Sequence, residues 1–164
     1  GAGGSDVQIP HECAAEEDFY RAVSGSFLVS CDNAHAVHPN YQNKTDATNC
    51  VYMNEGIVVK SHAGQKYTSD AQSIAVFRAI CEKAGVPVQF FANRSDAAGG
   101  STLGNIAMTQ VSMNAVDIGL PQLAMHSAYE TCGVKDTEYL IKAAGKFYSS
   151  HIHVSGDGKF QIEE

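Results

Sequence analysis

The sequence of 164 residues has no tryptophan, few basic residues and no long apolar run. No stretch approaches the roughly 20 apolar residues that cross a bilayer, so we expect no membrane partner. Eleven Lys and Arg stand against 18 Asp and Glu, which gives a formal charge of −7. Phosphate-backbone binding needs a concentrated basic face, and the sequence therefore argues against nucleic acid as a partner.

The cysteines also lack the patterns of metal or disulfide frameworks. There are five, an odd number, and none forms a CxxC pair: Cys13, Cys31, Cys50, Cys81 and Cys132. Several fall inside apolar runs, where free cysteine packs as a small hydrophobe, and we expect a reducing cytoplasm. The N-terminus has no signal-peptide pattern and no Met, so we expect a processed, truncated or cloned piece of a longer protein.

Hydrophobic spacing predicts one globular α/β domain in which helices alternate with strands. The clearest helix follows a Ser69-x-x-Gln72 capping box and ends at Gly85, with Pro87 beyond. Further helices are expected at residues 14–24, 105–111 and 137–148. Strands are expected at 27–29, 56–60, 88–92, 115–120 and 151–154, with a turn from Pro121 onward and a loose end at 156–158.

The richest cluster of polar chemistry follows the first strand. Asp32, His35 and His38 come directly after an apolar run, at the strand's carboxyl end, where open α/β sheets bind their ligands. His126 follows another strand, and Asp32 and His126 have the donor types that zinc prefers. The ordinary alternatives stay open: Asp32 as an Asx-turn or helix cap, and His126 as a hydrogen-bonded core histidine.

Other candidates are weaker. Lys60 and Tyr67 flank a turn and form a cation and phenol pair suited to a carboxylate, or else a solvated lysine and a core tyrosine. The glycines at 99, 100 and 104 lack a nucleotide-binding pattern, so they either pack a helix start against the sheet or line a pocket with backbone donors. Cys31 is expected to be a packing residue rather than a nucleophile.

Four segments, taken together and in order, resemble the aspartyl aminopeptidase family of dinuclear zinc metallopeptidases. They are SCDNAHAVHPNY at 30–41, IVVK at 57–60 with Lys66-Tyr67, GSTLG at 100–104, and PQLAMHS at 121–127. The resemblance runs from about Ser26 to Tyr148 and covers the carboxyl-terminal part of the family's catalytic domain. It implies a three-layer α/β/α sandwich, with residues 1–164 as one portion of a single catalytic domain.

The resemblance also implies the chemistry. Family members are aminopeptidases that release N-terminal residues, often acidic ones, from peptides with two zinc ions. By this likeness Asp32 ligates one zinc and His126 the other, while Asp32, His35, Lys60 and Tyr67 line the substrate site. Large closed homo-oligomers are typical of the family.

Several family elements have no counterpart in this sequence: an upstream histidine ligand, a bridging aspartate, the adjacent glutamate pair that includes the general base, and an inserted dimerisation domain. Glu16-Glu17 is interpreted as a solvated helix face. A catalytic zinc needs about three protein ligands, so we expect this chain alone to be inactive and to need the remaining part of the same protein. The alternative hypothesis is a non-catalytic structural or assembly module derived from that fold, and a third is a metal-binding or small-ligand protein without turnover.

Overall fold

The computed structural model describes residues 16–155 and 159–163. A four-stranded sheet in the order β1-β5-β3-β4 forms its centre. The strands are β1 (Phe27–Cys31), β5 (Asn114–Gly119), β3 (Ile57–Ser61) and β4 (Val88–Ala92). β1 runs parallel to β5 and β3 runs parallel to β4, but β3 and β5 are antiparallel. The sheet is therefore mixed.

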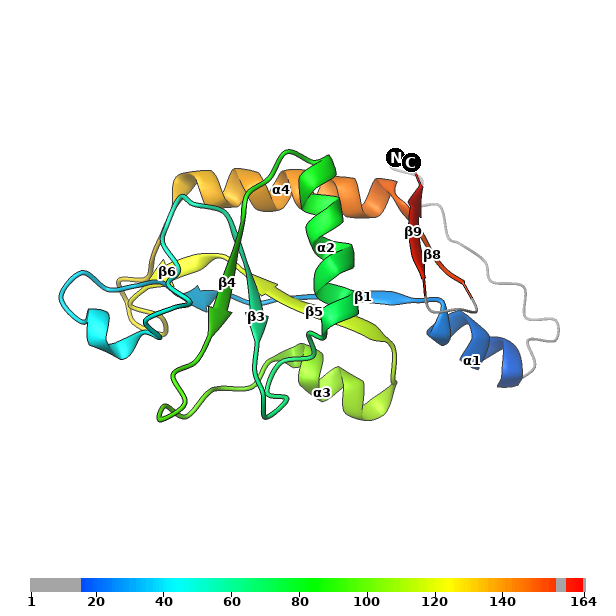
Figure 1. The fold of residues 1–164 in the computed structure, drawn as a ribbon, viewed down its shortest axis with the longest axis horizontal. Coiled ribbons are helices and arrows are strands. Elements are labelled where there is room, and N and C mark those ends of the chain that lie inside the picture. The colour runs from blue at the N-terminus through cyan, green and yellow to red at the C-terminus, as the bar shows by residue number, and fades with distance from the viewer. Residues whose placement is uncertain (1–15, 156–158, 164) are drawn as a thin grey trace, which may run out of the picture.

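Helices cover both faces of this sheet, as the α/β/α expectation requires. They are α2 (Ala71–Lys83), α3 (Leu103–Gln110) and α4 (Val134–Ser149). Figure 1 shows α4 above the strands and α3 below them. Helix α1 (Glu16–Ser24) precedes β1 and has no buried residue, which agrees with the interpretation of Glu16 and Glu17 as a solvated face.

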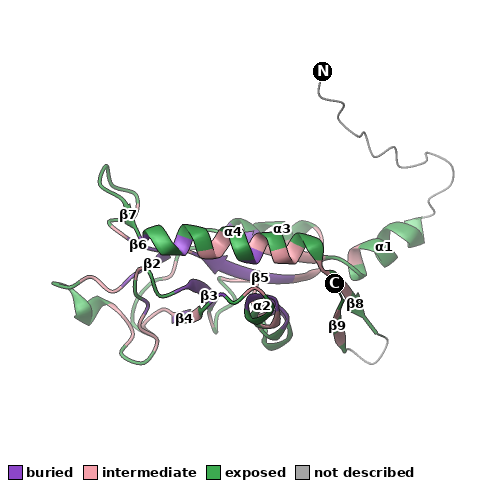
Figure 2. Cartoon of the chain, turned by 90° about the horizontal axis from the view of Figure 1, so that it is seen from above, coloured by how far each residue is buried: buried purple, intermediate pink, exposed green. Residues whose placement is uncertain are grey.

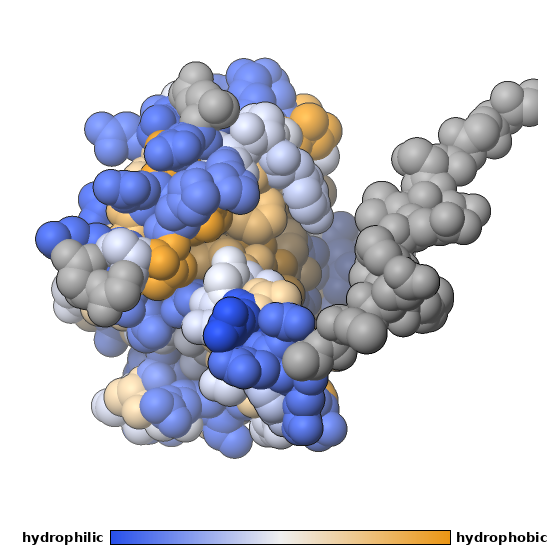
Figure 3. Space-filling view, turned by 90° about the vertical axis from the view of Figure 1, so that its right-hand side faces the viewer, coloured by the Kyte–Doolittle hydropathy of each residue, from blue (hydrophilic) through white to orange (hydrophobic). Residues whose placement is uncertain are grey.

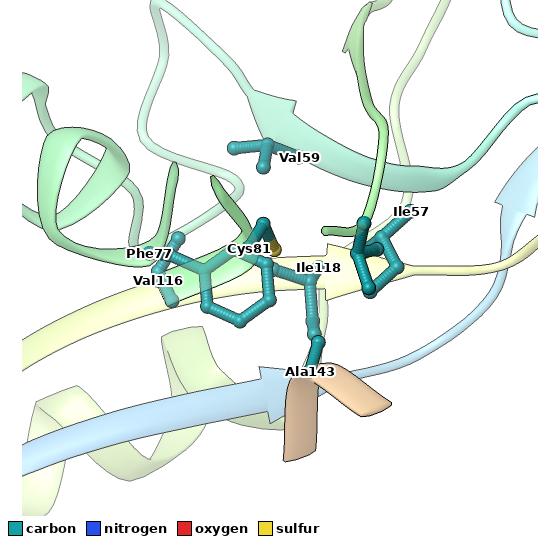
Figure 4. Close-up of a cluster of buried hydrophobic side chains, with 8 residues drawn as sticks. Ile57, Val59, Phe77, Cys81, Val116, Ile118 and Ala143 are labelled. Atoms are coloured by element: carbon teal, nitrogen blue, oxygen red, sulfur yellow. The ribbon is translucent and has the colours of Figure 1, made fainter. Parts of the chain in front are cut away.

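The main core lies between the sheet and the pair α2 and α4. Alternate residues of β3 and β5 meet Phe77 and Cys81 of α2 and Ala143 of α4 (Figure 4). β3 and β5 are buried along most of their length, whereas the outer faces of the helices are exposed (Figure 2). On the opposite face of β3, Val58 packs in a smaller cluster with Phe91. Because β3 and β5 are buried, the residues that follow these two strands are held in place by the core.

A second, three-stranded sheet follows the carboxyl ends of β1 and β5. It contains β2 (Ala34–His35), β6 (Pro121–Leu123) and β7 (Thr131–Cys132), in that order. The sequence predicted a turn from Pro121 onward, but residues 121–123 form a strand, in which Pro121 and Gln122 pair in parallel with β2, and the turn begins only after it. Gln42–Lys44 forms a short 3₁₀ helix in the loop that precedes β3.

The capping box predicted at Ser69 and Gln72 was also wrong. The helix cap is Asp70, whose side chain accepts the N–H of Ser73, while the Ser73 hydroxyl accepts the N–H of Asp70. The Ser69 hydroxyl is engaged elsewhere and accepts the N–H of Asp117 at 2.8 Å. Ser69 and Asp70 are adjacent, and either could cap the helix. Because the Ser69 hydroxyl is bound to the N–H of Asp117, Asp70 is the cap.

The last strands, β8 (His151–Val154) and β9 (Phe160–Glu163), pair only with each other. They form an antiparallel hairpin rather than an edge of the main sheet. Figure 3 views the side that carries α1 and this hairpin, where apolar residues gather in a hollow between hydrophilic surfaces. Cys13, residues 14 and 15 of the first predicted helix, and the predicted loose end at 156–158 lie outside the described residues.

Among the described residues, none of the helices combines the length and apolar character required to cross a membrane. Cys31, Cys50, Cys81 and Cys132 are free thiols. Cys31 is exposed at the last position of β1, so the expectation that it packs in the interior was wrong. Desolvation raises the pKa of its thiol, which agrees with the expectation that it is not a nucleophile.

Candidate functional site

Asp32 leads from β1 into β2 at the carboxyl end of β1, as its position after an apolar run predicted. The main sheet has no common carboxyl edge, because β3 and β5 are antiparallel. Its backbone N–H donates to the carbonyl of Ile118 at 3.0 Å, which continues the pairing of β1 with β5. Its own carbonyl oxygen accepts the Lys60 ammonium at 3.0 Å. The residue is exposed and begins no helix, so the helix-cap alternative does not apply.

Gly119 allows the chain to pass this close. It is the last residue of β5, and a Cβ there would lie 1.9 Å from the carbonyl oxygen of Asp32, where real Cβ atoms keep at least 3.0 Å. Any other residue would displace the Asp32 backbone. The position of Asp32 is therefore set by two buried strands and one glycine.

Lys60 lies inside the protein and is only 2% exposed, so the alternative of a solvated lysine is excluded. It is held on β3, and its ammonium lies 5.2 Å from the centre of the Tyr67 ring as well as on the Asp32 carbonyl. Burial lowers the pKa of Lys60, and the carboxylates of Asp32 and Asp117 oppose that shift. The carbonyl oxygen and the aromatic face partly compensate for the burial of the ammonium, and these contacts hold the Lys60 side chain in one position.

Tyr67 is half-buried beside Lys60, with its ring edge-on to Phe91 at 6.5 Å between centroids. Burial raises the pKa of its phenol, and the negative charges of Asp117 and Asp32 raise it further. The phenol is thus kept in its neutral form, in which it can donate a hydrogen bond. The structure brings Lys60 and Tyr67 together as the sequence predicted.

Asp117 is a site residue that the sequence reasoning missed. It is fully buried on β5, and its Oδ2 accepts both the N–H and the hydroxyl of Thr68, at 2.6 and 3.0 Å. Within the described part of the chain, its Oδ1 has no hydrogen-bond partner. Asp117 fixes the turn that carries Tyr67 and supplies negative charge near Lys60. A lone carboxylate inside the apolar run 115–120 was the signal that could have identified it.

His35 and His126 approach each other through the pairing of β2 with β6. His35 is exposed; partial desolvation lowers its pKa, and the nearby His126 and Lys60 lower it further. His126 follows β6 at a φ of 68°, a left-handed conformation that non-glycine residues seldom adopt. Its N–H donates to Glu130 Oε1 at 2.6 Å. The imidazole is exposed, so the alternative of a core histidine is excluded for His126.

A pocket of about 390 Å³ opens beside His35. His38 and Tyr41 line it from the loop after β2, and Arg94 and Gln122 line it from the other sides. The Arg94 guanidinium is bound to Asp96 at 2.6 Å and also donates to the carbonyl of Asn43. Of the predicted metal-binding and substrate-binding residues, His35 lines this pocket, whereas Asp32, Lys60, Tyr67 and His126 do not.

Gly104, the last glycine of the glycine loop, packs the start of α3 against β1. The N–H of Gly104 donates to the hydroxyl of Ser30 at 3.1 Å, and a Cβ at Gly104 would lie 2.6 Å from that hydroxyl. The first turn of α3 therefore rests directly on β1, which is the first of the two uses predicted for the loop. Gly99 approaches the side chain of Asn93 in the same way.

The donor set for a metal is incomplete. Asp32 and His126 are both exposed at the site edge, but within residues 16–155 and 159–163 no three His, Cys, Asp or Glu side chains converge as a metal site requires. A catalytic zinc takes about three protein ligands. The described residues alone therefore do not fit a complete zinc centre.

Comparisons with known proteins agree with one another. A family model described as aminopeptidase I zinc metalloprotease (M18) matches residues 8–148. A probable M18 family aminopeptidase 2 of Clostridium novyi is 54% identical over 133 residues, which cover 81% of this chain but 31% of that protein. The chain thus spans under a third of the length of this relative.

Solved structures share the fold. A cryo-EM structure of the Ape4 and Nbr1 complex matches with a TM-score of 0.81 and 38% identity, over 83% of this chain and 26% of that one. A structure of the S. cerevisiae mApe1 dodecamer matches with a TM-score of 0.70 over 80% of this chain and 28% of that one. At 23% identity, the second likeness concerns the fold alone.

Proposed function

We propose, because this chain belongs to the aminopeptidase I zinc metalloprotease (M18) family, that it supplies one side of an active site that releases N-terminal residues from peptides. The observation that carries the proposal is the meeting of Asp32, His35, Lys60 and Tyr67 near the carboxyl end of β1. There Lys60 holds the Asp32 backbone, and His126 lies near enough to His35 to lower its pKa. A purely structural module has no physical need for these groups together.

In this proposal Asp32 and His126 each ligate one of two zinc ions when the complete site is assembled. Bound zinc would lower the pKa of a water molecule and polarise the scissile carbonyl. Burial lowers the pKa of His35, which favours a neutral ring that can donate a hydrogen bond at one nitrogen and accept one at the other. Its place in the lining of the pocket suits contact with the substrate.

We further propose a preference for acidic N-terminal residues. Lys60 places a buried positive charge beneath the site, and Tyr67 adds a neutral phenol, so a substrate carboxylate would find a cation and a donor on the same wall. The Lys60 ammonium now donates to the Asp32 carbonyl, so it would act on a substrate at short range only by exchanging that partner. Lys60 then contributes mainly through its charge.

The remaining ligands and the general base are proposed to come from another part of the same protein. The two recognisable ligands here are one for each metal, and the chain matches 31% of its Clostridium novyi relative. Residues 1–164 would then be the carboxyl-terminal portion of one catalytic domain, without the inserted dimerisation domain and inactive alone. Assembly as a homo-oligomer in the cytoplasm completes the proposal; the mApe1 structure, which shares the fold, is a dodecamer.

The test compares two polypeptides: this chain alone, and the chain fused behind the portion of the Clostridium novyi relative that lies outside the match. Zinc per polypeptide is measured by mass spectrometry of metals, and turnover is measured on aspartyl, glutamyl and leucyl anilides. We expect two zinc ions and turnover of the acidic substrates in the fused form only. Asp32→Asn should abolish turnover, while Glu82→Gln, on the exposed face of α2, should leave it unchanged.

Two results would reject the proposal. Turnover with stoichiometric zinc by the chain alone would contradict the shared site, and a folded fused protein that binds no zinc and cleaves nothing would contradict the peptidase function. The second result favours the other candidate, a non-catalytic assembly module.

A further inference from the structure

The hairpin of β8 and β9 has two chemically different faces. Successive residues of a strand point to opposite faces, and residues paired across an antiparallel hairpin share a face. One face is apolar and includes the half-buried Ile152, Phe160 and Ile162. The other face is exposed and consists of His151, His153, Gln161 and Glu163. Two imidazoles therefore lie next to each other on the exposed face.

The two imidazoles are close together and have a carboxylate beside them. The ring centroids of His151 and His153 are 4.1 Å apart, and the ring planes meet at 85°. Glu163 pairs directly with His151, and its Oε2 lies 3.9 Å from His153 Nε2. Bonds from a metal ion to imidazole nitrogen measure about 2.0–2.1 Å, so one ion bridges two donors that are about 3–4 Å apart. Both rings are exposed and reach a common ion by rotation of their side chains alone.

The type of donor defines the class of ion. Neutral imidazole nitrogen binds Ni²⁺, Cu²⁺ and Zn²⁺, whereas Mg²⁺ and Ca²⁺ require oxygen ligands. Within residues 16–155 and 159–163, no three His, Cys, Asp or Glu side chains converge on one point. The ion is therefore held by two nitrogens, with water in its other coordination positions, and the carboxylate contributes charge.

We infer that His151 and His153 chelate one late first-row divalent ion, Ni²⁺, Cu²⁺ or Zn²⁺, on the exposed face of the β8–β9 hairpin, with Glu163 as the neighbouring negative charge. The inference does not depend on the proposed function, because the family model ends at residue 148. The hairpin also lies at the opposite end of the molecule from β6, the strand that precedes His126 (Figure 1). A bound ion would attract the β9 carboxylate toward the β8 imidazoles and so hold the two strands together.

The experiment titrates copper(II) chloride into the full chain and follows the backbone amide signals by NMR. Bound Cu²⁺ is paramagnetic and broadens the signals of nearby amides, so we expect broadening first at residues 151–154 and 160–163. Zn²⁺ should compete for the same position with lower affinity, and Mg²⁺ should leave these signals unchanged. His151→Gln and His153→Gln should each weaken Cu²⁺ binding at the hairpin at least about tenfold, because a chelate becomes a single ligand.

Matched variants exist for both the loss and a gain of affinity. His38→Gln and His62→Gln each remove an imidazole that accepts a backbone N–H, which a glutamine carbonyl can also accept. Both should leave the hairpin affinity within about twofold, since they lie outside it. Gln161→His places a third imidazole opposite His153 and should tighten binding at least about tenfold, whereas Val154→His, on the other face, should not.

Three results would overturn the inference. The first is broadening at the hairpin only at Cu²⁺ concentrations on the order of millimolar, which is the affinity of a single weak contact. The second is an equal loss of hairpin affinity in the variants of His38 and His62. The third is equal tightening by Val154→His and Gln161→His, which would show that the face of the hairpin does not matter. All five positions are at least partly exposed, so none of these changes should unfold the chain.

Discussion

Replacing Gly119 by alanine tests whether the packing of two central strands sets the site. The added Cβ would lie 1.9 Å from the carbonyl oxygen of Asp32, so that carbonyl must move to at least the 3.0 Å that real Cβ atoms keep. The same oxygen accepts the Lys60 ammonium at 3.0 Å. A shift of this size breaks that contact and leaves a buried ammonium without its oxygen partner.

The magnitude follows from two costs. Overpacking a tight interior costs about 1–3 kcal/mol, and β5 has little room to relax because it is buried between β1 and β3. An unsatisfied buried donor costs about 1–3 kcal/mol, and part of this is recovered if water reaches the ammonium. We expect Gly119→Ala to lower the free energy of unfolding by about 3 kcal/mol.

Urea unfolding followed by far-ultraviolet circular dichroism measures this change. The control is Gly145→Ala on α4, where a Cβ meets nothing within 4 Å and should raise the free energy of unfolding by about 0.5–1 kcal/mol. Opposite signs for the same chemical change are the expected result. A loss below about 0.5 kcal/mol at Gly119 would show that the Asp32 loop yields freely and would refute the reasoning.

Three further predictions concern buried and titrating groups. Asp136→Asn should lower the free energy of unfolding by about 2–3 kcal/mol, measured in urea, because the buried carboxylate accepts two backbone N–H groups and an amide can accept only one of them. Phe77→Ala should lower it by about 3–5 kcal/mol and reduce the thermal midpoint, because the ring fills the main core. An NMR titration should place the pKa of His35 below 6.5, and Lys60→Met should raise it only in part, since burial is the larger cause. Because protonation of His35 is disfavoured in the folded state, its contribution to stability should be lost as the pH falls below 6.5; a midpoint at or above that value would contradict the burial.

The elements that the sequence predicted well are those with strong local periodicity. The helix from Ala71 to Lys83 and the strand from Val88 to Ala92 were both expected, because apolar spacing and the Gly85 and Pro87 breakers are local signals. Boundaries were less accurate. The third and fourth helices begin at Leu103 and Val134, two and three residues earlier than expected.

What could not be predicted depends on contacts between distant segments. The small sheet forms because Pro121 and Gln122 pair with Ala34 and His35, and two- or three-residue strands carry no periodic signal. The helix cap moved to Asp70 because β5 occupies the hydroxyl of Ser69. Strand β9 was not predicted at all, and it exists through its pairing with β8.

The candidate site shows the same division. Asp32 lies at a strand's carboxyl end, as its position in the sequence indicated, and Lys60 lies beside Tyr67. The burial of Lys60 and the role of Asp117 were missed, because both depend on which face of the sheet a side chain occupies and what covers it. The ligand roles of Asp32 and His126 stay a prediction.

The β8–β9 hairpin lies outside the region that the family model matches, which ends at residue 148. Its strands bond to each other and not to the main sheet, and Figure 1 shows it at the opposite end of the molecule from β6. We expect changes in the hairpin to leave the residues around Asp32 in place, because the two lie at opposite ends of the molecule. The hairpin is therefore a suitable place to attach a fluorophore or an affinity tag for experiments on the residues around Asp32.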